Sequence, residues 1–366
     1  MEKDEKVKQI KFIKASELLK LKANKIREYE VIWKPEEMQR NTTAIYSDSR
    51  IYEPEYVQAL QLQEQLIHEF DGKSLETTFV GEVVFNDFGK CYHIQDECSS
   101  HLKKIDHEQS RRRIISDLKL VHGIGPVSER RLKQQGYLTI ENLRMHPRWK
   151  NSALQFLELM EVNDIGSLQK WLWRCLPKSH PLVHYLASCC RDEDFTLLDI
   201  ETLGLFGRAI VLLGVAKPKK TGIDIHQYLV RDIPDEPGVL WEFISHLTEK
   251  TALITFNGRS FDIPYIRERL EFYGIDGSLS LPHFDLLYFS RRAWRTQLSN
   301  CKLETLEKHL GVNRTVDIPS ALVPEFYETY LKTGNIGPLV AIVEHNKQDL
   351  CTLARLFSKL SEAWTS

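Results

Sequence analysis

The sequence contains no uninterrupted apolar stretch that approaches the length of a membrane span, so we expect no membrane-spanning helix and no membrane partner. Its first residues, Met1–Lys6, lack the apolar core of a signal peptide. The seven cysteines are odd in number and form no repeated close pairs, which predicts a reduced, cytoplasmic protein. We expect no zinc site, because no common zinc spacing is matched by the nearest candidates, Cys91, His93, Cys98 and His101.

The sequence also has no large excess of positive or negative charge. It contains 49 Lys and Arg residues and 51 Asp and Glu residues, which gives a net charge of −2. The whole chain is therefore not a basic nucleic-acid binder, and any basic surface must be local. At 366 residues, the chain is long enough for two or three domains with sizeable cores. The oligomeric state stays open.

The chain does contain a strand-length apolar run that ends in two acids, residues 195–202. Residues two apart on a strand point to the same face, so Asp199 and Glu201 are expected side by side. Two neighbouring carboxylates are costly to hold together unless a positive charge lies between them, and the simplest partner is Mg²⁺ or Mn²⁺. A strand that merely ends in two solvated acids would show the same pattern.

Two later stretches favour the metal-site interpretation. The apolar run at 253–256 ends in an Asn-Gly turn, after which Asp262 opens a helical pattern. Near the C-terminus, His345 and Asp349 are four residues apart in a long helical pattern, so they share one face of that helix. With the strand pair, these acids make a set of four carboxylates.

These motifs resemble the three exonuclease motifs of the DEDD (DnaQ-like) branch of the ribonuclease H-like superfamily. The most similar family that we can name is the YprB-like family of ribonuclease H-like exonucleases, over roughly residues 194–366. Further matching stretches are residues 283–287, 301–307 and 317–319. One feature departs from the better-known subfamilies: His345 stands four residues before Asp349, which is the spacing of the tyrosine type rather than of the histidine type.

The resemblance implies that two cations, Mg²⁺ or Mn²⁺, are held by Asp199, Glu201, Asp262 and Asp349 for two-metal phosphodiester hydrolysis. His345 is the candidate general base, because an unperturbed imidazole titrates near neutral pH; a helix-surface histidine is the alternative.

Three other residues are candidate substrate contacts. The resemblance places Thr202 and Leu203 near the terminal nucleotide. Asn257 is a candidate contact as well, although turn formation alone explains an Asn-Gly pair. We interpret Asp285, in a later strand, as structural.

The C-terminal half predicts a ribonuclease H-like α/β fold, with a mixed five-stranded sheet flanked by helices. Three consecutive strands are expected to be antiparallel, and a crossover helix then leads to a parallel fourth strand. The expected strands are 195–199, 210–216, 225–229, 253–256 and 283–287, and the helices are 237–248, 263–273 and those from residue 335 on.

Before this half we expect a mostly helical region that contains a small β-hairpin. A helical period runs through residues 1–40, and a second helix is expected at 55–70. The hairpin has strands at 77–85 and 90–95. The expected domains are an N-terminal helical segment (1–74), a small β-hairpin unit (75–100), a helical region (101–190) and the exonuclease domain (191–366).

Residues 120–132 resemble a helix-hairpin-helix motif within a locally basic region. Helix one is expected to end at the glycines, Ile124 to fill the hairpin, and Pro126 to open helix two. Gly123 and Gly125 would let the backbone approach a phosphate, and the amides at the start of helix two would bind it without reading sequence. An ordinary helical hairpin with glycine caps is the alternative.

The expected function is a metal-dependent 3′–5′ exonuclease that acts on single-stranded DNA or RNA, with a single-stranded end as its favoured partner. One alternative is a structure-selective endonuclease that uses the same metal pair. The other is a catalytically weak nucleic-acid-binding module, and the presence of all four carboxylates argues against it.

Overall fold

A seven-stranded mixed sheet lies at the centre of the protein. The structure is a computed structural model that describes residues 53–205, 207–314 and 318–365, so the helical period expected at 1–40 lies outside the described residues. The strand order is β1-β2-β5-β4-β3-β6-β7. The strands are β1 (Gly81–Asn86), β2 (Gly89–Cys98), β3 (Phe195–Thr202), β4 (Ile210–Lys219), β5 (Gly222–Leu229), β6 (Ala252–Thr255) and β7 (His283–Asp285).

Helices cover both faces of the sheet and form a separate group beside it. In the described part of the chain, no helix is long and apolar enough to cross a bilayer. The helices are α4 (Glu53–Glu69), α5 (Leu75–Thr78), α6 (His107–Ile115), α7 (Pro126–Gln134), α8 (Lys150–Val162), α9 (Ile165–Cys175), α10 (Pro181–Tyr185), α11 (Glu236–Ser245), α12 (Asp262–Tyr273), α13 (Leu286–Trp294), α14 (Leu303–Leu310), α15 (Val323–Thr333) and α16 (Gly337–Thr365).

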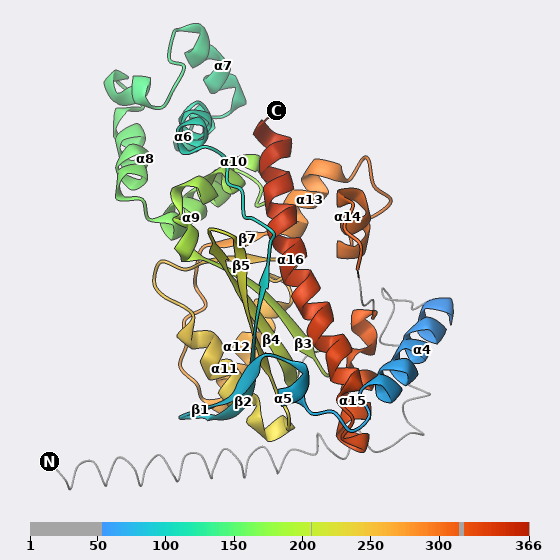
Figure 1. Cartoon of the computed structure of the whole chain (residues 1–366). Helices are drawn as coiled ribbons and strands as arrows, with labels where there is room; N and C mark the ends of the chain where they lie inside the picture. Colours follow the sequence, from blue (N-terminus) through green and yellow to red (C-terminus); the bar gives the residue numbers. More distant parts are fainter. Residues whose placement is uncertain (1–52, 206, 315–317, 366) are drawn as a thin grey trace, which may run out of the picture.

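The expected strand directions of the C-terminal half are confirmed. β3, β4 and β5 are successive antiparallel neighbours, and β6 and β7 follow in parallel on the other side of β3. One face of the sheet packs against α11 and α12, with Leu198 and Ile200 of β3 in that core. The long helix α16 runs across the opposite face (Figure 1). This sandwich fixes which side chains of β3 face α16.

The expected count of five strands is wrong, because the N-terminal hairpin joins the same sheet. β2 pairs antiparallel with β5 from Tyr92 to Cys98, so β1 and β2 extend the sheet on that side. The strand predicted at 77–85 also begins later than expected. Residues Leu75–Thr78 form a helical turn instead, closed by the Thr77 hydroxyl, which donates to the carbonyl oxygen of Ser74 at 2.9 Å.

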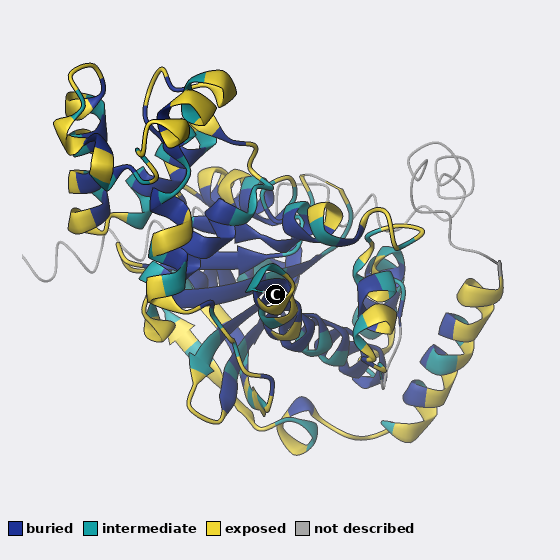
Figure 2. Ribbon diagram, turned by 90° about the horizontal axis from the view of Figure 1, so that it is seen from above, coloured by how far each residue is buried: buried dark blue, intermediate teal, exposed yellow. Residues whose placement is uncertain are grey.

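Residues 101–178, called the helical arm below, include α6 to α9, extend beyond one end of the sheet (Figure 1) and expose much of their outer surface (Figure 2). Its two longest helices are α8 and α9. The arm is anchored at β7, where the Gln169 amide exchanges two hydrogen bonds with the backbone of His283, at 3.1 and 3.0 Å. Arm and sheet also share one apolar core, so the arm is part of the folded body.

The proposed helix-hairpin-helix segment differs from the expectation in its first helix. α6 ends at Ile115, and a single 3-10 turn, Leu118–Leu120, comes before the glycines. The side chain of Asp117 starts this new turn by accepting from the amide of Lys119 at 3.1 Å. The second helix begins as predicted, with Gly125 as its N-cap and Pro126 in the first turn.

Candidate active site

Strand β3 presents Asp199 and Glu201 to helix α16. Leu198 and Ile200 point into the opposite core, so the period of two puts both carboxylates on the α16 face, as predicted. Asp199 Oδ2 accepts a hydrogen bond of 2.8 Å from Asn346 of α16. The pairing of β3 with β4 shifts at the end of this stretch, between residues 201 and 202, which is a common place for a bulge beside a site.

Asp262 is brought to β3 from the next strand, β6. It is the first residue of α12 and only 5% exposed. The backbone of Ile200 in β3 and the charge of Asp349 both affect the pKa of its carboxyl group, so Asp262 lies beside the strand that carries Asp199 and Glu201. The structure therefore unites the first two predicted motifs.

The turn before Asp262 is held by Asp285. This carboxylate accepts from the amides of Asn257 and Arg259, at 2.9 and 3.1 Å, and from Leu287 at the start of α13. Asn257 itself adopts a left-handed conformation, with φ of 63°. Asn257 therefore has a turn-forming role, and Asp285 shapes the loop that delivers Asp262.

Helix α16 carries the third motif across the same face. His345 is 4% and Asp349 9% exposed, one turn apart. The Nε2 atom of His345 lies 3.9 Å from Glu201 Oε1 and 3.8 Å from Asp349 Oδ2. All five residues predicted for the catalytic set are thus gathered between β3, α12 and α16.

The four carboxylates disfavour each other's ionisation. Burial raises the pKa of Asp199 well above its usual range, and the charges of Asp349, Glu201 and Asp262 add to that rise. Burial also raises the pKa of Glu201, with further contributions from Asp349 and Asp262. For Asp262, burial raises the pKa to about 7 against the opposing effect of backbone hydrogen bonds. Crowded acids of this kind need a positive partner.

The donor set suits a hard divalent cation, since every candidate ligand is a carboxylate oxygen. The side-chain types therefore fit a metal site, but their present positions do not. Among the described residues, no three His, Cys, Asp or Glu side chains converge closely enough to hold a metal ion as they stand. One member of the set, Asp349, has another cationic partner.

That partner is Arg314, which belongs to none of the sequence motifs. Its Nη2 donates to Asp349 Oδ1 at 2.5 Å and its Nε to Glu307 Oε2 at 2.7 Å. Its Nη1 lies 2.9 Å from Nδ1 of His345. Arg314 lies more than thirty residues before His345 and Asp349, the two residues of α16 that it contacts. No local motif in the sequence therefore indicates these contacts.

The contact with Arg314 fixes the proton position on His345. A guanidinium group can only donate, so Nδ1 of a neutral His345 accepts and its proton lies on Nε2. Nε2 lies 3.2 Å from the hydroxyl of Ser320. In this arrangement the ring has no lone pair available to take a proton from water.

A second unpredicted contact holds Asp199 in place. Asn346 donates to Asp199 and accepts a hydrogen bond of 2.9 Å from Gln227 of β5. Gly214 of β4 makes room for it, because a Cβ there would lie 2.1 Å from Asn346 Oδ1. This small network fixes both the amide orientation of Asn346 and the rotamer of the carboxylate that it touches.

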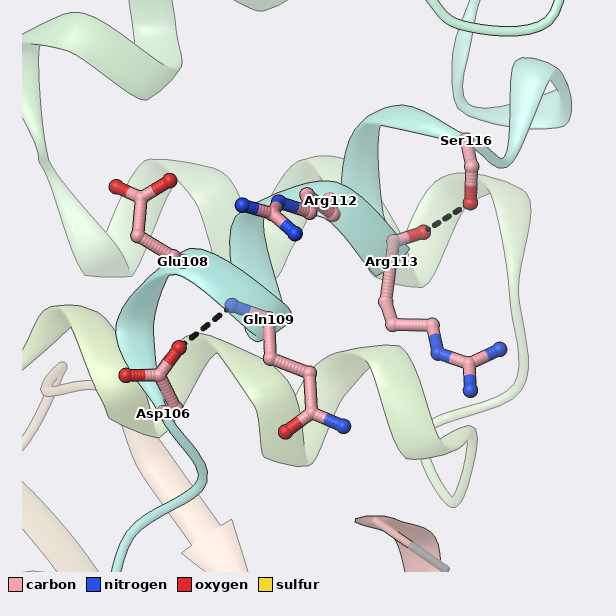
Figure 3. A pocket seen from close by; sticks show the side chains of 6 residues that line it. All are labelled: Asp106, Glu108, Gln109, Arg112, Arg113 and Ser116. Carbon is pink, nitrogen blue, oxygen red and sulfur yellow. Dashed lines mark hydrogen bonds between the residues drawn. The ribbon is translucent and has the colours of Figure 1, made fainter.

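The predicted nucleic-acid contacts fall in two places. Thr202 and Leu203 directly follow the strand pair; the Thr202 hydroxyl donates to the carbonyl oxygen of Gly204 at 2.8 Å. Gly123 and Gly125 lie on the helical arm, away from the carboxylates, and Gly123 has a positive φ of 83°. The arm also carries a pocket of about 390 Å³ over α6 (Figure 3), which is lined by Asp106, Glu108, Gln109, Arg112, Arg113 and Ser116.

Comparison with known proteins agrees with this geometry. Residues 196–361 match the model of the RNase_H superfamily, a segment that contains all five residues predicted for the catalytic set. The mixed sheet is consistent with a ribonuclease H-like fold over this segment. The chain is also 32% identical over 233 residues to an uncharacterized protein, YprB, of Bacillus subtilis (strain 168), an alignment that covers 62% of this chain and 54% of that protein. The chain thus spans about half the length of this curated relative.

Proposed function

We propose that the protein is a metal-dependent nuclease of the DEDD type, which removes nucleotides from the 3′ end of single-stranded DNA or RNA. The observation that carries this proposal is the meeting of four acids from three separate segments, each raised in pKa or tied to a cation, within a ribonuclease H-like domain. A purely structural cluster of this kind would be costly to bury.

In this proposal Asp199, Glu201, Asp262 and Asp349 hold two ions, Mg²⁺ or Mn²⁺. Bound there, the ions would activate the attacking water and stabilise the leaving oxygen. Asn346 keeps the Asp199 carboxylate oriented, and Asp285 keeps the Asp262 loop in place. Thr202 and Leu203 would lie beside the terminal nucleotide.

Digestion of labelled substrates tests the proposal. Single-stranded DNA and RNA carrying a 5′ label, and circular single strands of the same composition, are incubated with Mg²⁺ or Mn²⁺ and with a chelator. A 3′–5′ exonuclease shortens the linear strands stepwise, leaves the circles intact and stops with the chelator. Cleavage of the circles would indicate the endonuclease instead, and no metal-dependent cleavage of any substrate would contradict the proposal.

His345 is the proposed general base, which acts once its Nδ1 has left Arg314. Substituting His345→Ala is therefore expected to lower the turnover by roughly 10²–10⁴-fold. Metal binding should be retained, because the four carboxylates remain. Steady-state rates and manganese titrations check both parts, with the exposed His101→Ala as the control. A rate within a few-fold of the parent would show that the reaction needs no proton acceptor at His345.

The helical arm is proposed to bind the phosphate backbone through Gly123, Gly125 and the start of α7. Removing the whole arm is a poor test, because its core is continuous with that of the sheet. A single substitution at Gly125 is sharper. This residue has an ordinary extended conformation, with φ of −95°, and a Cβ placed there meets no atom within 4 Å.

Gly125→Glu is accordingly expected to fold normally but to repel phosphate. Binding of long strands should weaken, and the slope of log affinity against log salt should fall by about one, as for the loss of one phosphate contact. Val162→Glu, on the exposed end of α8 in the same arm, adds the same charge elsewhere and serves as the control. Equal affinities of the two variants at two salt concentrations would leave the motif with a packing role alone.

A further inference from the structure

Arg314 brings a positive charge to Asp349, one of the four clustered acids. Its side chain is only 7% exposed. Its three contacts go to Glu307, Asp349 and His345, of which the last two belong to the proposed catalytic set. A single guanidinium therefore engages one proposed metal ligand and the proposed base at the same time.

Glu307 provides an anchor for Arg314 that is independent of the catalytic carboxylates. It lies on α14 and is 2% exposed. One of its oxygens accepts from Arg314 at 2.7 Å, and the other accepts from the hydroxyl of Thr352 at 2.6 Å. Arg314 would therefore keep a buried anionic partner if it released Asp349.

Arg314 and a divalent cation cannot both be well bound at the same face of Asp349. Each needs the carboxylate as a charge partner, and the two positive charges would repel each other at close range. In the structure, Arg314 donates to Asp349 Oδ1, so a cation that uses this oxygen would have to displace the guanidinium.

We propose that Arg314 is an internal counter-ion that competes with the divalent metal for Asp349, so that metal loading requires Arg314 to retreat toward Glu307. This inference rests on the proposed metal-dependent function. The same retreat frees Nδ1 of His345, so metal binding and release of the base are coupled. Arg314 is thus a positioning residue that sets the affinity of the site for metal.

Manganese titration by calorimetry tests this on the full chain, for the parent, Arg314→Met, Arg314→Lys and the double variant Glu307→Gln/Arg314→Met. Removing the competitor is expected to tighten manganese binding by about 5–150-fold, the usual range of coupling between two ligands. Arg314→Lys, which keeps the charge but loses the planar fork, should fall between. Arg231→Met removes the same charge from an ion pair with Glu76 and should bind as the parent does.

The double variant separates competition from simple electrostatic attraction. Arg314→Met alone leaves Glu307 without a cationic partner, and its uncompensated negative charge would itself attract the metal. Glu307→Gln removes it, so tighter binding that persists in the double variant supports competition. If Arg314→Met does not fold, the double variant replaces it in the test. In the double variant residue 307 is a neutral amide, so position 307 carries no buried charge without a partner.

Thermal unfolding supplies a second readout that does not depend on activity. The rise in Tm caused by manganese should be larger in the Arg314 variants than in the parent, because tighter ligands stabilise more at equal concentration. Equal or weaker manganese binding in Arg314→Met and in the double variant would overturn the inference. Absence of manganese binding to the parent and to every Arg314 variant would overturn the proposed function instead, whereas measurable binding that is no tighter in the variants overturns only the inference.

Discussion

Asp199→Ala is expected to abolish metal-dependent hydrolysis while the protein remains folded. The substitution removes the central carboxylate of the set, the one that the charges of Asp349, Glu201 and Asp262 all affect. In the proposed site, the loss of one of the four carboxylates would weaken the hold on the ions that activate water and stabilise the leaving oxygen. Rates on end-labelled single strands measure the effect, and Glu193→Ala, an exposed acid before the same strand, is the control.

Removing the charge of Asp199 is also expected to change the stability of the metal-free protein. Burial raises the pKa of Asp199 in the folded protein above its unfolded value, so its ionised form reduces stability increasingly as the pH rises. The metal-free Asp199→Asn protein, which keeps the shape of the side chain, should therefore gain more stability over the parent at pH 8 than at pH 6. Full hydrolytic activity of Asp199→Ala, or a gain confined to low pH, would contradict this description of the site.

Arg269→Met is expected to have the largest effect on stability, with the free energy of unfolding lowered by about 3–5 kcal/mol. Arg269 and Glu236 are 2% and 0% exposed and form two hydrogen bonds, at 2.8 and 2.5 Å. Glu236 also accepts from Tyr273 and from the amide of Ile210, the first residue of β4. Removing the arginine leaves a buried carboxylate without its charge partner.

Denaturant titration of the metal-free protein measures this loss, with Arg267→Met on the exposed side of α12 as the control. A double variant, Glu236→Leu/Arg269→Met, should recover part of the lost stability, because replacing both members of a buried pair by apolar groups is often close to neutral. If Arg269→Met lowers the free energy of unfolding by less than about 1 kcal/mol, the buried pair contributes no more than a surface ion pair does, which would contradict the prediction.

The parts of the site that were predictable are those in which sequence spacing alone fixes direction. The period of two in β3 puts Asp199 and Glu201 on one face of that strand. The spacing of four in α16 puts His345 and Asp349 on one face of that helix. An acid that opens a helical pattern after an Asn-Gly turn marks Asp262. Local chemistry was sufficient for each of these, and the ribonuclease H-like match covers all of them.

The parts that were missed depend on contacts between residues far apart in the chain. The hairpin joins the sheet because β2 pairs with β5, more than one hundred residues later, and no local pattern specifies that partner. Arg314 follows an unremarkable helix, α14, and its role arises only because α14 packs beside α16. Asn346 lies between two predicted residues, yet its role depends on Gln227 and Gly214 in other strands.

The central claim is that Asp199, Glu201, Asp262 and Asp349 form one metal centre. Anomalous diffraction from crystals of the protein soaked in Mn²⁺ tests it most directly, because manganese is located without any reference to activity. Anomalous peaks are expected beside these four carboxylates, with Arg314 moved from Asp349 toward Glu307. Saturating manganese that leaves the site empty, with Arg314 still bound to Asp349, would contradict it.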